Sequence, residues 1–157
     1  RRSVRANLLF ALSASGYARQ TRVELAEKWM HQGKLAHLVD QPARRLSGGE
    51  QQRLSLVRAL CCNPEILFLD EPCAHLDVNA AQDVEALIKS AIEAGIKVVM
   101  ITHDRAQARR FGGEILLMEG GQVKAQEGAA LFFGPSQNPW TQAFLQGYEI
   151  SDAEAET

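Results

Sequence analysis

A strand, a helix and a second strand follow one another between residues 66 and 102, and this succession constrains the fold more than any other feature. Residues 66–69 (ILFL) form a short, continuous apolar run, and residues 97–102 (KVVMIT) form another. Such runs are typical of strands buried on both faces of a parallel sheet. Residues 79–94, which lie between them, carry apolar residues at helical spacing. We therefore predict a right-handed βαβ unit and an α/β fold class.

The residues before this unit have a helical pattern. An amphipathic helix is predicted at the N-terminus, with its apolar face made by Val4, Leu8, Leu9 and Leu12. A secretory signal is the alternative there, but its apolar core would be longer and purer. Further helices are predicted over residues 21–32, with Gly33 as the cap, and over residues 49–62. We predict a helical subdomain over residues 1–62.

Residues 63–150 are predicted to form the α/β part. After the second strand, Gly120 and Gly121 separate two strand-like segments and predict a hairpin over residues 114–126. Short helices are expected near residues 129–133 and 139–146. Residues 151–157 are acidic and small, and we expect a frayed tail there.

Charge, hydropathy and cysteine content exclude several classes of protein. Seventeen Lys and Arg residues against 19 Asp and Glu residues give a net charge of -2, which implies no general affinity for nucleic acid. No apolar run approaches the roughly 18 residues that span a bilayer, so the chain is not itself a membrane channel. The three cysteines show no C-x-x-C spacing, and Cys61 and Cys62 are predicted to be small buried hydrophobes in a reducing compartment.

A glycine-rich loop, residues 46–50 (LSGGE), precedes the third predicted helix. Gly48 and Gly49 let backbone N–H groups approach an anion closely, and the N-terminus of a helix adds a favourable partial charge. Ser47 supplies a hydroxyl donor. The same residues also suit a plain helix-entry turn, so the loop by itself leaves both interpretations open.

Two carboxylates, Asp70 and Glu71, follow the first strand and precede Pro72. In α/β sheets, ligands bind outside the carboxyl ends of the strands. Asp70 is suited to hold Mg²⁺, usually through water, and Glu71 is then positioned to polarise an attacking water. A solvated loop pair is the alternative, but four apolar residues that end in two acids argue against it.

Two further features follow the carboxylates along the chain. Residues 73–77 (CAHLD) form a predicted tight turn before the next helix, and Asp77 could simply cap that helix. His103 comes directly after the second strand, which predicts that its imidazole lies at the same sheet edge as Asp70 and Glu71. A purely structural histidine is the alternative.

In this order and spacing, the four features resemble the C-terminal portion of an ATP-binding cassette (ABC) ATPase. Residues 46–50 match the signature loop of that family, and residues 66–71 match its Walker B strand with the catalytic glutamate. Residues 74–77 resemble the D-loop, and His103 resembles the switch histidine. The resemblance covers residues 3–148. It implies a partial P-loop NTPase, with a RecA-like parallel sheet core and an N-terminal helical subdomain.

The resemblance also implies a function. The parent protein would be the ATP-binding and ATP-hydrolysing subunit of a transporter, with two such subunits enclosing two ATP molecules. The residues that bind nucleotide would be Ser47, Gly48, Gly49, Gln51 and Asp77, the first four of them toward the partner's nucleotide. Asp70 would hold Mg²⁺, Glu71 would be the general base and His103 would contact the γ-phosphate. The partners would be a second ATP-binding subunit and transmembrane permease subunits, at the cytoplasmic face of the membrane, with no nucleic acid.

Residues 134–147 resemble the tails of importer subunits for phosphate, tungstate or polar amino acids, which favours import. The chain departs from the family in two ways: it contains no G-x-x-x-x-G-K-[ST] motif, and Cys73 stands where Ser or Thr is usual. We therefore expect a fragment that lacks roughly the first third of an ordinary nucleotide-binding domain and is inactive alone.

Two other functions remain open. One is a chromosome-maintenance or DNA-repair ATPase head, which should show long heptads before the signature loop, and residues 1–45 carry none sustained over three heptads. The other is a non-catalytic module that lends its signature loop to a complete partner.

Overall fold

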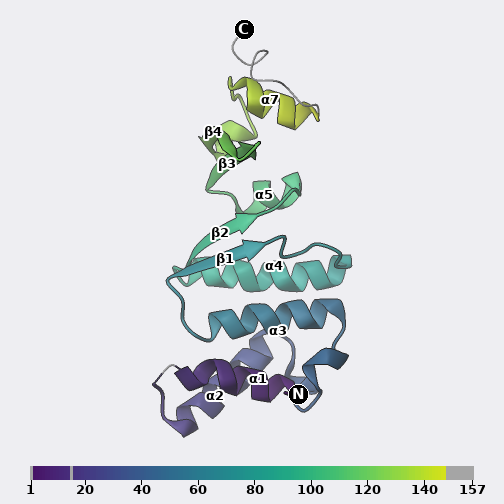
Figure 1. Cartoon of the computed structure of the whole chain (residues 1–157), viewed down its shortest axis with the longest axis vertical. Helices are drawn as coiled ribbons and strands as arrows, with labels where there is room; N and C mark the ends of the chain where they lie inside the picture. Colours follow the sequence, from purple (N-terminus) through teal and green to yellow (C-terminus); the bar gives the residue numbers. More distant parts are fainter. Residues whose placement is uncertain (1, 15, 148–157) are drawn as a thin grey trace. The chain divides into compact units, whose positions relative to one another are not determined.

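The computed structural model describes residues 2–14 and 16–147, which fall into two compact units (Figure 1). The first unit extends to Ile101 and the second begins at Thr102. The predicted boundary after residue 62 lies inside the first unit, where the third helix packs on the fourth. The predicted frayed tail, residues 151–157, lies outside the described residues.

The first half of the first unit is helical, as predicted. It comprises α1 (Val4–Ala11), a 3₁₀ turn (Leu12–Ala14), α2 (Arg19–Gln32), two further 3₁₀ turns (Ala36–Leu38 and Ala43–Arg45) and α3 (Gly48–Leu60). Of the four residues predicted for the apolar face at the N-terminus, Val4, Leu8 and Leu12 are fully buried and Leu9 is half-buried. Their neighbours α2 and α3 contribute Met30, Val57 and Leu60 to the same half of the unit. This half therefore has an apolar core of its own.

Gly33 allows the end of α2 to approach α3 closely. A Cβ atom at Gly33 would lie 2.7 Å from Cγ2 of Val57, which is closer than side chains tolerate. Gly33 is the C-terminal cap of α2, as predicted, and the chain turns at Lys34, whose φ of 54° is left-handed. Close packing, rather than a special backbone angle, therefore requires the glycine.

The predicted strand–helix–strand unit is present. β1 (Ile66–Asp70) and β2 (Lys97–Ile101) pair in parallel, with Asp70 opposite Ile101, and α4 (Val78–Glu93) connects them. The buried residues of α4 are Val84, Leu87, Ile88 and Ala91. In the first unit α3 lies beside α4, which also packs on β2 (Figure 1).

The prediction that both strands are buried on both faces is wrong for this structure. Leu67 is 5% exposed, but Phe68 on the opposite face is 74% exposed. Ile66, Val99 and Ile101 share the face of Phe68 and are exposed as well. Within the described residues, β1 and β2 pair only with each other. Two strands and one helix supply too little surface to cover both faces.

The second unit contains a hairpin between short helices. It comprises α5 (Arg105–Phe111), β3 (Glu114–Glu119), β4 (Gln122–Gly128), α6 (Ala129–Phe132) and α7 (Pro139–Gln146). The hairpin prediction is confirmed: β3 and β4 are antiparallel, and Gly120 and Gly121 have φ values of 56° and 77°. Positive φ at both central residues is the requirement of a tight type I′ turn.

The helix α5 was missed by the sequence analysis. Its N-terminus is capped by Asp104, whose Oδ1 accepts hydrogen bonds from the N–H groups of Ala106 and Gln107 at 2.8 and 3.1 Å. An Asp at this position, with Arg109 and Arg110 in the last turn, is the usual signal of a short helix. The signal was present but short, because the helix has seven residues.

The cysteine prediction is half correct. Cys61 is buried, and burial, together with the adjacent Cys62 thiol, raises the pKa of the Cys61 thiol to about 12. Cys62 is exposed, contrary to the prediction, because α3 ends at Leu60 and Cys62 no longer follows its buried face.

Candidate functional site

The glycine-rich loop forms the N-terminus of α3 and is closed by a capping box. Oγ of Ser47 accepts a hydrogen bond from the N–H of Glu50 at 3.4 Å, and Oε2 of Glu50 accepts one from the N–H of Ser47 at 2.7 Å. The second bond is the main cause of the lowered pKa of the Glu50 carboxyl. A carboxylate thus already lies at the helix terminus where an anion was expected. The amides of Gly48 and Gly49 remain in the first turn, where N–H groups have no intrahelical acceptor.

The two glycines of the loop have different surroundings. Gly48 is exposed, and a Cβ atom added there would have no atom within 4 Å. Gly49 is buried, and a Cβ atom there would lie 2.6 Å from Cβ of Ala80 on α4. Gly48 therefore leaves its backbone open to a ligand, whereas Gly49 allows α3 and α4 to pack closely.

The side chain of Gln51, a predicted nucleotide-binding residue, braces the loop. Its Nε2 donates a hydrogen bond to the carbonyl oxygen of Leu46 at 2.8 Å. This bond links the first turn of α3 to the residue before Ser47. Gln51 is therefore placed to hold the shape of the loop.

The turn before α4 lies next to this loop. Asp77 is the N-cap of α4, with Oδ1 accepting from the N–H of Ala80 at 2.9 Å, and His75 has a left-handed φ of 60°. Both loops line one hollow of about 410 Å³. Its lining residues are Ser47, Gly48, Gly49, Glu50, Arg53, His75, Leu76, Asp77, Asn79, Ala80 and Asp83. Four of the predicted nucleotide-binding residues, Ser47, Gly48, Gly49 and Asp77, thus line one hollow, and their role in binding nucleotide stays a prediction.

Two charged residues of this hollow, Arg53 and Asp83, were not predicted from the sequence. Arg53 lies on the buried face of α3 and is 9% exposed. A charged residue on the apolar face of an amphipathic helix was the available signal, because burial of a charge requires a partner. Asp83 offered no such signal, because it is only half-buried on α4 and does not stand out on an apolar face.

The paired carboxylates lie at the carboxyl end of β1, as predicted from the strand pattern. Asp70 is the last residue of β1 and is exposed, while Glu71 is half-buried. Glu71 has a left-handed φ of 45°, and its N–H donates to the carbonyl oxygen of Ile101 at 2.9 Å. For a residue with a side chain, this conformation costs on the order of 1–3 kcal/mol, and such residues cluster at functional sites. The backbone thus changes direction at Glu71, and the hydrogen bond to Ile101 of β2 fixes this turn.

His103 belongs to the second unit. It is exposed and follows Thr102, whose Oγ1 accepts a hydrogen bond from the N–H of Asp104 at 3.0 Å. The expected position of its imidazole beside Asp70 and Glu71 stays a prediction.

The donor set at Asp70 suits a cation that is shared with a ligand. Over residues 2–14 and 16–147, no group of three or more His, Cys, Asp or Glu side chains is arranged to hold a metal ion. Mg²⁺ is commonly bound by one or two carboxylates together with phosphate oxygens and water. A single exposed carboxylate fits that mode of binding.

In the same described part of the chain, no helix has the length and apolarity to cross a bilayer.

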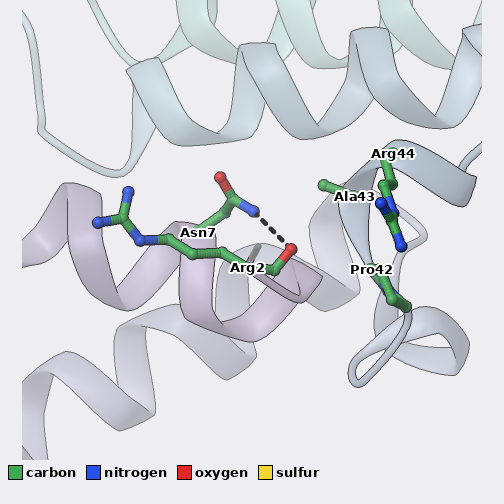
Figure 2. A pocket seen from close by; sticks show the side chains of 5 residues that line it. All are labelled: Arg2, Asn7, Pro42, Ala43 and Arg44. Carbon is green, nitrogen blue, oxygen red and sulfur yellow. Dashed lines mark hydrogen bonds between the residues drawn. The ribbon is translucent and has the colours of Figure 1, made fainter.

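A second hollow, also of about 410 Å³, is lined by residues of the helical half (Figure 2). Arg2, Asn7, Pro42, Ala43 and Arg44 line it, and Nδ2 of Asn7 donates to the carbonyl oxygen of Arg2 at 3.4 Å. The Arg2 guanidinium lies 3.7 Å from the centre of the Phe10 ring, a cation–π contact. Because Arg2 is engaged there and Arg44 is exposed, the hollow has no buried polar group that would mark a binding site.

Comparisons with known proteins show which proteins this chain is similar to. The sequence model of the family described as "ABC transporter" matches residues 1–74. The chain is 30% identical over 145 residues to the methionine import ATP-binding protein MetN 2 of Oenococcus oeni, which covers 92% of this chain and 41% of that protein. It is 33% identical over 129 residues to the arginine transport ATP-binding protein ArtP of Escherichia coli, which covers 82% of this chain and 52% of that protein.

A solved structure gives the same result. MJ1267, an ATP-binding cassette of an ABC transporter, matches with a TM-score of 0.74 at 25% identity, over 91% of this chain and 62% of that one. The predicted resemblance and fold class are confirmed by these matches. The chain spans about half the length of the curated relatives that it matches.

Proposed function

We propose, from this chain's membership of the ABC transporter family of ATP-binding domains, that it forms the signature-loop and Walker B part of an importer ATPase. The relatives named above are import or transport ATP-binding proteins, which supports transport over a role in chromosome maintenance or DNA repair. In this proposal the longer protein hydrolyses ATP to drive uptake of a solute through permease subunits. It lies at the cytoplasmic face of the membrane and works as a pair of ATP-binding subunits.

The observation that carries the proposal is the backbone at Glu71. A half-buried carboxylate directly after a strand, in a left-handed conformation that β2 holds by a hydrogen bond, is suited to reach a water molecule beyond the sheet edge. Mg²⁺, when bound by Asp70 and phosphate oxygens, would neutralise charge that develops on the phosphates. Glu71 would accept a proton from the attacking water, and His103 would contact the γ-phosphate.

The signature loop has a separate role in the proposal. The exposed Gly48 amide and the Ser47 hydroxyl would bind the γ-phosphate of a nucleotide held by the partner subunit. The hollow shared with Asp77 supports this assignment, because it gathers a helix N-terminus and the D-loop turn on one surface. Gly49 and Gln51 would support the loop from behind.

The test is a pair of matched substitutions in the full-length gene product. Glu71→Gln should leave ATP binding unchanged and lower the hydrolysis rate by about 10²–10⁴-fold, the usual contribution of a general base. Glu65→Gln makes the same chemical change at an exposed residue directly before β1 and should leave hydrolysis within about twofold of the wild type. Near-normal hydrolysis by Glu71→Gln would overturn the assignment of the base.

A further inference from the structure

A buried guanidinium joins three elements beneath the signature loop. Nε of Arg53 on α3 donates to the carbonyl oxygen of Gly33, at the end of α2, at 3.0 Å. Nη1 of Arg53 lies 3.3 Å from Oδ2 of Asp83 on α4. The other carboxylate oxygen of Asp83 accepts a hydrogen bond from Nζ of Lys34 at 2.5 Å. Two cations therefore share one carboxylate where the ends of α2, α3 and α4 meet.

Arg53 also supports the loop directly. It follows Gly49 by one helical turn, and a Cβ atom at Gly49 would lie 3.7 Å from its Nη1. The guanidinium thus fills the space behind Gly49, while Ala80 of α4 limits that space from the other side. Both Arg53 and Asp83 line the hollow that the signature loop shares with the D-loop.

Burying a charge costs several kcal/mol, and replacement of buried ion pairs by apolar residues is often neutral or stabilising. An arginine at this position therefore contributes something other than packing energy. Its planar fork directs hydrogen bonds in fixed directions, so it sets the relative position of the groups it binds.

We propose that Arg53 is a positioning residue that fixes the signature loop against the D-loop through Gly33 and Asp83. Gly48 and Asp77 then face the same ligand as one surface. The inference rests on the proposed function only in identifying that ligand as the partner's nucleotide.

Amide hydrogen exchange in the chain tests the positioning directly. The reporters are two amides of each loop, the N–H groups of Ser47 and Gln51 and those of Ala80 and Ala81, all hydrogen-bonded in the structure. Arg53→Gln should speed exchange at these four amides about tenfold or more, and leave the amides of α1 within about twofold of the wild type. The matched control is Arg58→Gln, the same substitution at an exposed position of the same helix, which should leave all of them unchanged.

Asp83→Asn is a second variant, and by itself it should speed exchange at the same four amides, which keeps the test available if Arg53→Gln fails to fold. Where both variants fold, adding Arg53→Gln to Asp83→Asn should produce less than about a further twofold change, because the two residues act as a pair. A uniform acceleration across α1 and both loops would mean that Arg53 supports global stability only. Independent, multiplicative effects of the two substitutions would also overturn the proposal.

A nucleotide experiment on the full-length gene product connects the positioning to function. Arg53→Gln should weaken ATP-induced pairing of subunits about tenfold and leave ATP affinity of the isolated subunit unchanged. Arg53→Lys keeps the charge but loses the fork, and it should recover less than half of the loss. Unchanged pairing by Arg53→Gln would overturn the link to the nucleotide. If the wild-type protein does not pair with ATP, the proposed function fails while the exchange experiment still decides the role of Arg53.

Discussion

The helical half of the first unit and its two-stranded sheet differ in how much of their apolar surface is buried by the chain itself. Around the signature loop, the N-termini of α3 and α4 are capped and the buried arginine is paired, and Val4, Leu8 and Val57 of the helical half are fully buried. At β1 and β2 the backbone is paired, yet Phe68 and Ile101 are 74% and 63% exposed. The helical half therefore obtains its burial from contacts within the chain. One face of the sheet, by contrast, has apolar side chains that the described residues do not cover.

The largest expected effect concerns activity. The chain contains the residues that resemble the signature loop and the Walker B strand, but the sequence has no G-x-x-x-x-G-K-[ST] motif to bind phosphates. Because phosphoryl transfer depends on positioning of the phosphates, we expect no measurable ATP turnover by the purified 157-residue chain. A coupled phosphate-release assay measures this. Steady turnover that disappears in Glu71→Gln would show that this chain hydrolyses ATP without that motif.

The next prediction compares the two faces of β1. Leu67→Ala removes a side chain that is 5% exposed and should lower the free energy of unfolding by about 2–5 kcal/mol. Phe68→Ala removes a larger side chain that is 74% exposed, and we expect a loss below about 1 kcal/mol. Urea unfolding of the purified chain gives both values. An equal loss for the two variants would show that the face of Phe68 is covered in solution.

The same contrast explains what could be predicted from the sequence. Helical spacing identified the buried face of α1, and the run at residues 66–69 identified β1, because both patterns reflect local geometry. The run also led to the prediction of burial on both faces, which depends on neighbours that a local pattern does not contain. The Arg53–Asp83 pair was missed for a related reason, since its residues are thirty positions apart on separate helices. The carboxylates after β1 were predictable because strand ends and ligand crevices coincide in α/β sheets.

A smaller effect separates the two glycines of the signature loop. Gly49→Ala places a methyl group 2.6 Å from Cβ of Ala80 and should destabilise the chain by about 1–3 kcal/mol through overpacking of α3 against α4. Gly48→Ala meets open space and should change the free energy of unfolding by less than about 1 kcal/mol, because alanine suits a helix better than glycine does. Thermal unfolding of the two variants measures the difference. Equal destabilisation would contradict the assignment of Gly49 to packing and Gly48 to ligand approach.

The smallest effect concerns the charge on Glu50. The N–H of Ser47 holds the pKa of the Glu50 carboxyl below its ordinary value of about 4.5, so the folded chain favours the ionised form. A group whose pKa is lowered by folding contributes stability above its ordinary pKa, and loses that contribution as the pH falls through the lowered value. Glu50→Gln can keep the capping box but removes the charge from the N-terminus of α3, which should cost about 0.3–1 kcal/mol at pH 7.

The difference in free energy of unfolding between Glu50→Gln and the wild type should therefore be constant above about pH 5.5. It should shrink as the pH falls below about 4.5, where the Glu50 carboxyl of the unfolded chain takes up a proton first and that of the folded chain follows at lower pH. Urea unfolding at a series of pH values measures it. Glu27→Gln, the same change at an exposed position inside α2, should show a smaller difference, because the charge there lies far from a helix N-terminus. A difference that grows on acidification would have the wrong sign for a carboxylate stabilised by Ser47. Such a result would show that the capping box does not stabilise the N-terminus of α3.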